Sequence, residues 1–392
     1  MLRLLSKSEP AAPRGLPYSR HWIDEDDIRA VTAVLRSDWL TTGPAVESFE
    51  NDVAAYTGAR HAVAVSSGTA ALHAAMHVLN IGPGDEVIVP AITFAATANA
   101  VLFQGGTPVF ADVEPGTLCI SPASAAERVT PRTRAIVSVD YAGQPCDYAS
   151  LRGIANRHGL ALVTDACHAL GAEYGTRKVG TCGDLTVFSF HPVKHIATGE
   201  GGMAVTDDAR FAARMRMFRN HGITTGPRQR ETWFYEMADL GYNYRLSDFQ
   251  AALGRSQLRK LPARLERRWQ IAKLYARAFA RDTRIAPLSL RPETTHAWHL
   301  YVVRLGCLGG ADGRMRVYQR MREAGIGVNV HYIPVHLHPF YRRTLGTGPG
   351  LCPEAEAAYE QILSLPMFPQ MSDADVDYVV EALRDSLSAS AR

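Results

Sequence analysis

Lys194 is the residue whose type and position most clearly suggest chemistry. It lies in the stretch FSFHPVKHIATGEGG (188–202), between an apolar run and a glycine-rich turn. Few other charges surround it, so we expect the amine to be partly withdrawn from water. A desolvated amine loses its proton more easily and becomes a nucleophile toward carbonyl carbons. The alternative interpretation is an ordinary surface lysine on a loop.

Asp165 is a second candidate, because it ends the apolar run LALVTD (160–165). A carboxylate at the end of a buried strand is costly without a cationic partner, so the partner should be a ligand or a buried cation. His168 follows three residues later and could face the same site. A structural cap is the alternative for Asp165.

Two further segments could bind parts of a cofactor. Ser67, Gly68 and Thr69 follow an apolar run and open directly into a helix-like segment. Free backbone N–H groups and the helix dipole make such a helix start suitable for an anion, although a plain helix cap would look the same. Phe94 follows the next apolar run, where an aromatic side chain could cover a flat ring or belong to the core.

These parts together fit pyridoxal 5'-phosphate (PLP). This cofactor needs a lysine for its aldehyde, a carboxylate to keep its ring nitrogen protonated, an anion site for its phosphate and an aromatic cover for its ring. Lys194 and Asp165 would be catalytic. Once released from the aldehyde, Lys194 could move a proton between carbon atoms.

The composition describes an ordinary globular protein. The chain has 392 residues, of which 46% are hydrophobic and 21% charged, with a formal net charge of +3. This near neutrality gives no support for a nucleic-acid partner. The six cysteines form no C-x-x-C pair, which is expected for reduced thiols in a cytoplasmic protein. We find no signal-peptide pattern and no apolar run of membrane-spanning length, so no membrane partner is expected.

Seven apolar runs alternate with helix-like segments in the first half of the chain. They are rich in Val, Ile and Ala and apolar on both alternations, which is expected of strands buried on both faces. Such alternation predicts an α/β fold with a mostly parallel seven-stranded sheet, in which ligands bind at the carboxyl ends of the strands. The runs are residues 61–67, 86–90, 107–113, 134–143, 160–169, 185–190 and 202–207.

The rest of the chain has a different pattern. Two helices (24–36 and 44–56) are expected in an N-terminal arm, and a long helical region at 246–280, with a kink or break at Pro262. Strands at 299–305 and 327–335 and helices at 315–325 and near the C-terminus complete an α+β unit. We therefore expect residues 1–259 to form the arm and a large PLP-binding domain, and residues 260–392 a small C-terminal domain.

Four motifs carry a resemblance to a known family. The stretches SSGTAALH, DACHALG, FSFHPVKHIATGEGG and LGYNYRL resemble the DegT/DnrJ/EryC1/StrS family of nucleotide-sugar aminotransferases, which have the PLP-dependent transferase fold type I. The resemblance runs from about Pro17 to the last helix. Within the family, PYSRHWIDEDDIRAV, SDWLTTGPAVESFE, IVSVDYAGQPCD and GVNVHYIPVH resemble the pseudaminic acid branch.

The resemblance implies roles for individual residues. Lys194 would hold the cofactor aldehyde as a Schiff base (the internal aldimine), Asp165 would pair with the pyridine nitrogen, and His168 would bind near the ring hydroxyl. Asn243 would reach the phosphate in the neighbouring subunit, which makes a homodimer with shared sites necessary. The phosphate would be held by Ser67, Gly68, Thr69 and Ser189, and the sugar nucleotide by Tyr18, Asp38, Trp39, Leu40, Thr41, His331, Tyr332, Ile333 and Pro334.

The reaction that the resemblance implies is a two-stage transamination. L-Glutamate would give its amino group to the cofactor, which would pass it to the 4-keto carbon of a UDP-linked 2-acetamido-2,6-dideoxy-hexos-4-ulose. A different 3- or 4-keto nucleotide sugar, or a PLP-binding protein without turnover, are the alternatives. A dehydratase branch of the family has histidine in place of the lysine, and Lys194 argues against it.

A metal site is a competing interpretation of HYIPVHLHP (331–339). His331, His336 and His338 are close in sequence, but Pro334 and Pro339 interrupt regular strand geometry and no carboxylate or cysteine lies nearby. We therefore expect these histidines to act as hydrogen-bonding groups and expect no metal.

Overall fold

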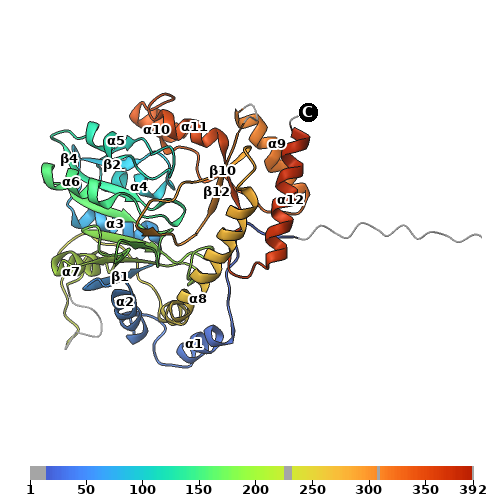
Figure 1. Ribbon diagram of the computed structural model, residues 1–392. Helices are drawn as coiled ribbons and strands as arrows, with labels where there is room; N and C mark the ends of the chain where they lie inside the picture. Colours follow the sequence, from blue (N-terminus) through green and yellow to red (C-terminus); the bar gives the residue numbers. More distant parts are fainter. Residues whose placement is uncertain (1–14, 225–231, 307–309, 391–392) are drawn as a thin grey trace, which may run out of the picture.

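The computed structural model describes residues 15–224, 232–306 and 310–390. Its centre is a seven-stranded sheet in the order β1-β9-β8-β5-β4-β2-β3 (Figure 1). The four pairs among β3, β2, β4, β5 and β8 are parallel, whereas β9 pairs antiparallel with both β1 and β8. Its strands are β1 (His61–Val65), β2 (Glu86–Pro90), β3 (Thr107–Ala111), β4 (Thr133–Val139), β5 (Ala161–Asp165), β8 (Leu185–Ser189) and β9 (Gly202–Thr206).

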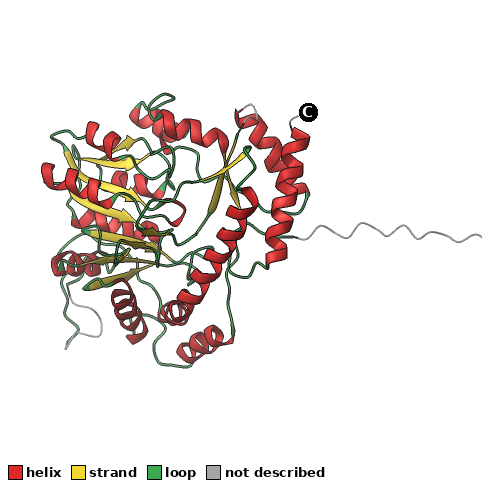
Figure 2. Ribbon diagram, in the orientation of Figure 1, coloured by secondary structure: helices red, strands yellow, loops and turns green. Residues whose placement is uncertain are grey.

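All seven predicted strands are therefore present, and the predicted mostly parallel α/β sheet is confirmed. The central strands are buried nearly throughout, as their apolar composition on both faces requires. Figure 2 shows the strands side by side with helices packed around them. These helices are α3 (Gly68–Val78), α4 (Ala96–Phe103), α5 (Pro122–Glu127), α6 (Tyr148–His158) and α7 (Ala209–Phe218).

The N-terminal arm has the two predicted helices, α1 (Glu25–Leu35) and α2 (Pro44–Thr57). Asp24 caps α1 in a capping box with Asp27, and Pro44 occupies the first turn of α2, where its missing N–H costs nothing. Before α1, the chain crosses to the C-terminal part of the molecule, where Leu16 bridges to Ile326. The arm thus contacts segments that are distant in the sequence.

Helix α8 (Asp248–Phe279) connects the large sheet with the C-terminal elements. It runs continuously through Pro262, so the break we considered there does not occur, although a proline is costly inside a helix. A second, antiparallel sheet has the order β10-β12-β13. Its strands are β10 (Ile285–Pro287), β12 (Tyr301–Leu305) and β13 (Ile362–Leu365), with α9 (Gly310–Glu323), α11 (Pro353–Gln361) and α12 (Asp373–Ser390) nearby. Helix α10 (Pro339–Leu345) belongs with the large sheet, where its Tyr341 packs against Phe110.

One predicted strand is wrong. Residues 327–335 do not form a strand; they make an isolated bridge from Asn329 to Ser364, and Val335 begins a short 3-10 helix (Val335–Leu337). Polar side chains there bond locally, since Asn329 Oδ1 accepts from the amide of Val330 and His331 pairs with Ser364. A short sheet that the sequence did not reveal joins β6 (Glu173–Tyr174), β7 (Arg177–Lys178) and β11 (Thr294–Thr295).

The buried apolar side chains form two clusters. The first surrounds the large sheet, and the second joins the end of α8 from Ile271 to β10, β12, β13, α9 and α12. The division at residues 259/260 lies inside α8, so it cannot be a linker. We keep it as a proposal about packing, in which the small unit is the part of the chain built around the second cluster.

Candidate active site

Lys194 lies at the carboxyl edge of the large sheet, five residues after the end of β8. Its amide donates to the carbonyl of His191 at 2.8 Å, which closes a tight turn just after Ser189. The side chain is half-buried, and its ammonium group makes no hydrogen bond or ion pair with the described residues. Burial lowers the pKa of Lys194, and the nearby Cys167 and Asp165 oppose that shift. The amine is therefore free for a ligand.

Asp165 ends β5, the strand next to β8, so its carboxylate lies at the same edge. It is 6% exposed. Its Oδ2 accepts from the hydroxyl of Thr97 at 2.8 Å, and Oδ1 accepts from the amide of Cys167 at 3.2 Å. Thr97 in turn contacts Thr93 at 2.8 Å between hydroxyl oxygens. These bonds orient the carboxylate without neutralising it.

The two threonines are functional candidates that the sequence did not reveal. Thr97 is distant from Asp165 in sequence, and a threonine inside a helix carries no recognisable motif. One available signal was the row of small residues in TFAATANA (93–100), which lets α4 approach the sheet edge closely.

His168 is buried beside Asp165 and Lys194. Its Nε2 lies 3.2 Å from the hydroxyl of Tyr332, and its ring packs against the ring of His299 with a centroid distance of 4.3 Å. Burial, followed by the positive charge of Lys194, holds the pKa of His168 well below its usual range. The imidazole is thus neutral and acts as a hydrogen-bonding group.

The predicted anion site forms at the N-terminus of α3. Ser67 caps the helix, with its hydroxyl accepting from the amide of Ala70 at 3.1 Å. The amides of Gly68 and Thr69 have no partner among the described residues, so they can meet an anion. A Cβ on Gly68 would lie 3.0 Å from the Cβ of Ser189 and 3.1 Å from the Sγ of Cys167. The glycine thus keeps a narrow space open between strand end and helix.

A glycine on the neighbouring strand is also required. A Cβ on Gly202, the first residue of β9, would lie 2.3 Å from the carbonyl oxygen of Ser67. This contact explains the glycine-rich sequence after Lys194, because β9 must run directly against the α3 turn. The anion site is therefore positioned by β8 and β9 together.

The residues predicted to bind the sugar divide into two groups. In the first group, Tyr332 lies near Phe94 and His168, and Tyr18 packs against His331 with ring centroids 5.8 Å apart. Ser19, beside Tyr18, donates to the carbonyl of Val193 at 3.3 Å. The structure therefore brings the arm and the segment 331–334 to the loop that carries Lys194. Of that segment, Ile333 is exposed and Pro334 is buried.

The second group lies at the start of α8. The carbonyl of Leu40 accepts from the amide of Asp248, and Thr41 bridges to Ser247. Asp38 and Trp39, which precede them, are exposed, and so is Asn243, whose backbone bridges to Asn220. The described hydrogen bonds of Leu40, Thr41 and Asn243 involve none of Lys194, Asp165 and His168. In the single chain, all five residues of this group are exposed: Asp38, Trp39, Leu40, Thr41 and Asn243.

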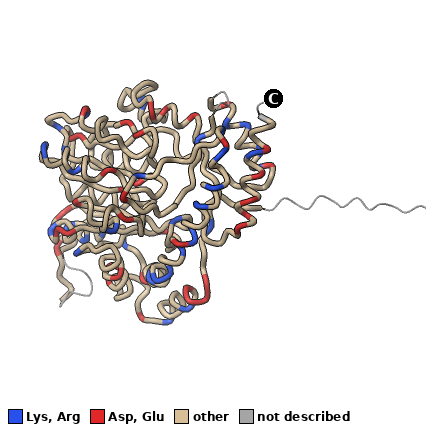
Figure 3. Tube along the Cα trace, in the orientation of Figure 1, with Lys and Arg blue, Asp and Glu red and all other residues tan. Residues whose placement is uncertain are grey.

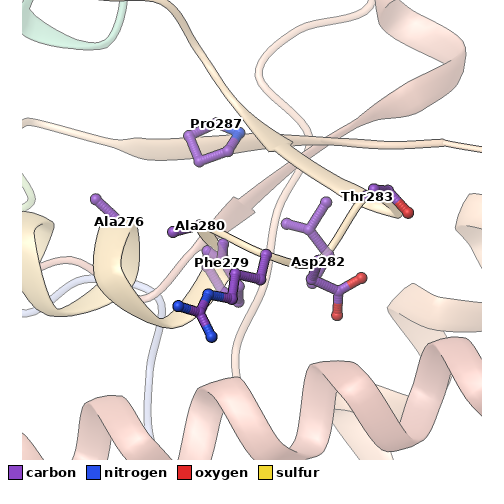
Figure 4. Close-up of a pocket in the computed structure, with 8 residues that line it drawn as sticks. Ala276, Phe279, Ala280, Asp282, Thr283 and Pro287 are labelled. Atoms are coloured by element: carbon purple, nitrogen blue, oxygen red, sulfur yellow. The ribbon is translucent and has the colours of Figure 1, made fainter.

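Charged side chains of both signs and two recesses lie outside this site. Basic and acidic side chains are interspersed along the trace (Figure 3). One recess of about 300 Å³ lies at the end of α8, where Phe279, Asp282 and Pro287 line it (Figure 4), and Asp282 already pairs with Arg284. A second recess of about 350 Å³ is lined mainly by residues of α8 and β11.

Two of the three histidines of HYIPVHLHP have separate partners. His331 Nδ1 lies 2.8 Å from the hydroxyl of Ser364, and His336 Nε2 lies 2.9 Å from a carboxylate oxygen of Glu356. Within residues 15–224, 232–306 and 310–390, no cluster of three or more potential ligands is arranged to hold a metal ion. In the same ranges, no helix has both the length and the apolar character needed to cross a bilayer.

Comparison with known proteins identifies the family. The DegT/DnrJ/EryC1/StrS aminotransferase family model matches residues 21–384. The spore coat polysaccharide biosynthesis protein SpsC of Bacillus subtilis is 43% identical over 375 residues, covering 94% of this chain and 96% of that protein.

Two solved structures extend this result. A putative sugar aminotransferase of Streptococcus pneumoniae, solved in PLP and PMP forms, superposes on this chain with a TM-score of 0.91 at 32% identity. The match to its PLP form covers 96% of this chain and 99% of that protein. Helicobacter pylori PseC, an aminotransferase of pseudaminic acid biosynthesis, gives the same TM-score and identity, with 96% of this chain and 100% of PseC covered. The family is PLP-dependent, and this chain belongs to it as a sugar aminotransferase.

Proposed function

We propose that this enzyme transfers the amino group of L-glutamate to the 4-keto carbon of UDP-2-acetamido-2,6-dideoxy-β-L-arabino-hexos-4-ulose. The product would be UDP-4-amino-4,6-dideoxy-N-acetyl-β-L-altrosamine, a precursor of pseudaminic acid. The likeness to PseC over nearly the whole of both chains supports this choice of sugar. The name of SpsC, a polysaccharide biosynthesis protein, also supports a sugar substrate.

The observation that carries the aminotransferase chemistry is the unpartnered amine of Lys194 beside Asp165 and the α3 N-terminus. The residues present fit PLP. The free amides of Gly68 and Thr69 and the space that Gly68 keeps open would receive the phosphate, with the hydroxyls of Ser67 and Ser189 at its sides. Asp165, already held by Thr97, would pair with the ring nitrogen.

The remaining chemistry belongs to the side chains around the cofactor. When bound, PLP supplies an aldehyde that takes up an amino group and a protonated ring that withdraws electrons. Lys194 would move a proton between the carbon of the donor that bears the amino group and the carbon of the cofactor aldehyde. Taking up this proton requires a neutral amine. Burial lowers the pKa of Lys194 and so raises the neutral fraction of the amine. His168 would bind the ring hydroxyl, and Tyr332 restrains its Nε2.

We further propose that the working enzyme is a homodimer in which Asn243 reaches the phosphate of the other subunit. The segment Asp38–Thr41 would line the partner's sugar site in the same way. This proposal is supported by large apolar side chains that are exposed in the single chain, since soluble proteins rarely leave many such groups in water. They include Phe94, Trp39, Leu40, Trp233, Phe234, Met237, Leu240 and Phe249.

An absorption experiment tests the donor and the acceptor together. The purified protein should show the visible band of bound PLP, which L-glutamate should bleach and the UDP-linked 4-keto sugar should restore. If glutamate bleaches the band and this sugar does not restore it, the enzyme uses a different keto sugar. If added PLP gives no band, the role of Lys194 is wrong.

Variants test the mechanism and the shared site. Lys194→Ala should remove the band and all turnover while the far-UV circular dichroism stays that of the native fold. Each site would draw Lys194 and Asn243 from different subunits. A mixed dimer of Lys194→Ala and Asn243→Ala subunits would then have one intact site, and should show about half of the activity of the unaltered dimer. A random mixture, in which about half of the dimers are mixed, should show about a quarter. Confirmed mixed dimers without activity would count against a site shared in this way.

A further inference from the structure

A turn outside the proposed cofactor residues supports both Lys194 and His168. This turn comprises residues 297–300. The amides of Ala297 and Leu300 donate to the carbonyls of Gly143 and Ala142, at 2.8 and 3.1 Å. The carbonyl of Ala297 lies 2.9 Å from Nε2 of His195, the residue directly after Lys194. The turn is thus bonded to the lysine loop.

Contacts with Arg268 and Gly143 also hold this turn in a fixed conformation. Trp298 has a φ of +50°, which is unfavourable for a bulky side chain. The buried guanidinium of Arg268 donates to the carbonyls of Trp298 at 2.9 Å and His299 at 3.4 Å. A Cβ on Gly143 would lie 2.9 Å from the amide of Trp298 and 3.0 Å from that of His299. Strain of this kind persists only where the surroundings fix it, and it is common at functional sites.

His299 projects from this turn onto His168. The two rings are 4.3 Å apart between centroids, and His299 is 3% exposed. The Nδ1 atoms of both rings are buried and have no hydrogen-bond partner among the residues that the structure describes. An unpartnered buried N–H costs more than an unpartnered lone pair, so we place the proton of His168 on Nε2. There the N–H can donate a hydrogen bond to the hydroxyl oxygen of Tyr332. Each ring of the pair therefore has a buried nitrogen that no described side chain or backbone group satisfies.

We propose that His299 is a positioning residue: its ring covers one side of the His168 imidazole, excludes water, and fixes His168 as the neutral tautomer with its proton on Nε2. This inference rests on the proposed function only in placing His168 at the cofactor. If His168 stays neutral, Lys194 and not the imidazole is the group of this pair of neighbours whose charge changes.

Several titratable groups face this pair, and all of them favour neutral rings. Burial is the main reason that the pKa values of His168 and His299 lie well below the usual range, and Lys194 adds to it for both. The positive charge of Arg268 acts on His299 in the same direction. These groups are Lys194, His195, His331 and Arg268. Tyr332 contacts Nε2 of His168, and the neighbouring Asp165 and Cys167 act on Lys194, whose pKa they raise.

The test is an NMR titration of ¹⁵N-histidine-labelled protein prepared without cofactor, with the His168 signals assigned by their loss in His168→Gln. In the unaltered protein, His168 should remain neutral and protonated on Nε2 at every pH from 7 to 5. In His299→Ala, water reaches the ring, so its pKa should rise by about one unit or more and both tautomers should appear. His299→Phe keeps a flat ring and should restore the original behaviour.

Two controls separate positioning from loss of stability. Tyr275→Phe removes one buried hydrogen bond, to the carbonyl of Pro366 in the small unit, and should leave the His168 titration unchanged. His299→Ala should also reduce kcat of the holoenzyme by about tenfold with a smaller change in KM, and His299→Phe should reverse most of this. An unchanged His168 titration in folded His299→Ala, or no restoration by His299→Phe, would overturn the proposal. Failure of the sugar assignment would appear only as absent turnover and would leave the titration intact.

Discussion

At the scale of single residues, the site depends on groups that hold the candidate catalytic side chains in place. The hydroxyl of Thr97 donates to Asp165, so its single proton is used there and the hydroxyl of Thr93 must donate to Thr97. This chain of two hydroxyls fixes the direction of the carboxylate that is proposed to pair with the ring nitrogen. Hydrogen bonds to a charged group are stronger than bonds between neutral groups.

Thr97→Val should therefore weaken both catalysis and cofactor binding. A hydrogen bond to a charged acceptor contributes about 1.5–3 kcal/mol, so we expect kcat to fall by about tenfold or more. Thr97→Ser should retain most of the activity, and Thr93→Val should have an intermediate effect, because Asp165 keeps its donor. Steady-state kinetics and the dissociation constant for PLP measure the series. Equal activity of Thr97→Val and the unaltered enzyme would remove Thr97 from the site.

The sequence predicted the residues that carry a chemical signature and missed those that support them. Lys194 and Asp165 were predicted because a charge at the end of an apolar run is unusual. Thr97 and His299 touch Asp165 and His168 only after the chain has folded, across long stretches of sequence. Neither residue type is unusual where it stands, so only the three-dimensional structure reveals its contact.

At the scale of elements, the candidate anion site lies at the junction of α3 with β8 and β9. The strands were predictable because both faces are apolar, whereas the segment 327–335 has the composition of a strand but pairs at Asn329 only. Pro334 lacks an N–H, and His331 bonds through its side chain to Ser364, so a continuous ladder does not form there. Composition predicts a strand well when burial decides the conformation, and poorly when local polar contacts do.

Gly68→Ala tests the narrow space at this junction. The backbone can accept alanine, but the new Cβ would meet Ser189 and Cys167 at 3.0–3.1 Å and narrow the space proposed for the phosphate. We expect a folded protein whose affinity for PLP is lower by about tenfold or more, since the lost contacts are charge-assisted. Equilibrium dialysis with PLP measures this loss.

Gly153→Ala is the matched control for that change. Gly153 lies inside α6, where the nearest atom to a new Cβ is Nη1 of Arg157 at 3.6 Å. This substitution should leave PLP affinity unchanged and stabilise the helix by about 0.5–1 kcal/mol. If both variants bound PLP equally well, the anion would have to lie elsewhere.

At the scale of the whole molecule, buried neutral histidines make stability depend on pH. Burial lowers the pKa of His73 and of His331 from 6.5 to about 4, and holds those of His168 and His299 well below 6.5. The unfolded chain then binds more protons than the folded one between pH 4 and 6.5, so stability is lost as the pH falls through this window. Asp140 acts in the opposite sense, because burial raises its pKa to about 7.

The histidines outnumber this single carboxyl group, so acidification should destabilise the protein. One histidine with a folded pKa of about 4 reduces the free energy of unfolding by about 2 kcal/mol between pH 7 and pH 5. Urea unfolding at pH 7, 6 and 5 measures this directly, and His73→Phe should reduce the slope. A stability that is constant or rises toward pH 5 would contradict the assignment of these histidines as neutral.

Helix α8 also determines how the chain can be taken apart. Leu258 and Leu261 are buried in the first cluster, whereas Ile271 and Tyr275 are buried in the second. Any cut at residues 259/260 would leave each fragment with half of a helix and an uncovered apolar stripe. The two units are therefore unsuited to separate expression, to circular permutation at this point, or to exchange between relatives as modules. A chimaera would have to take α8 and the residues of both apolar clusters from the same parent protein.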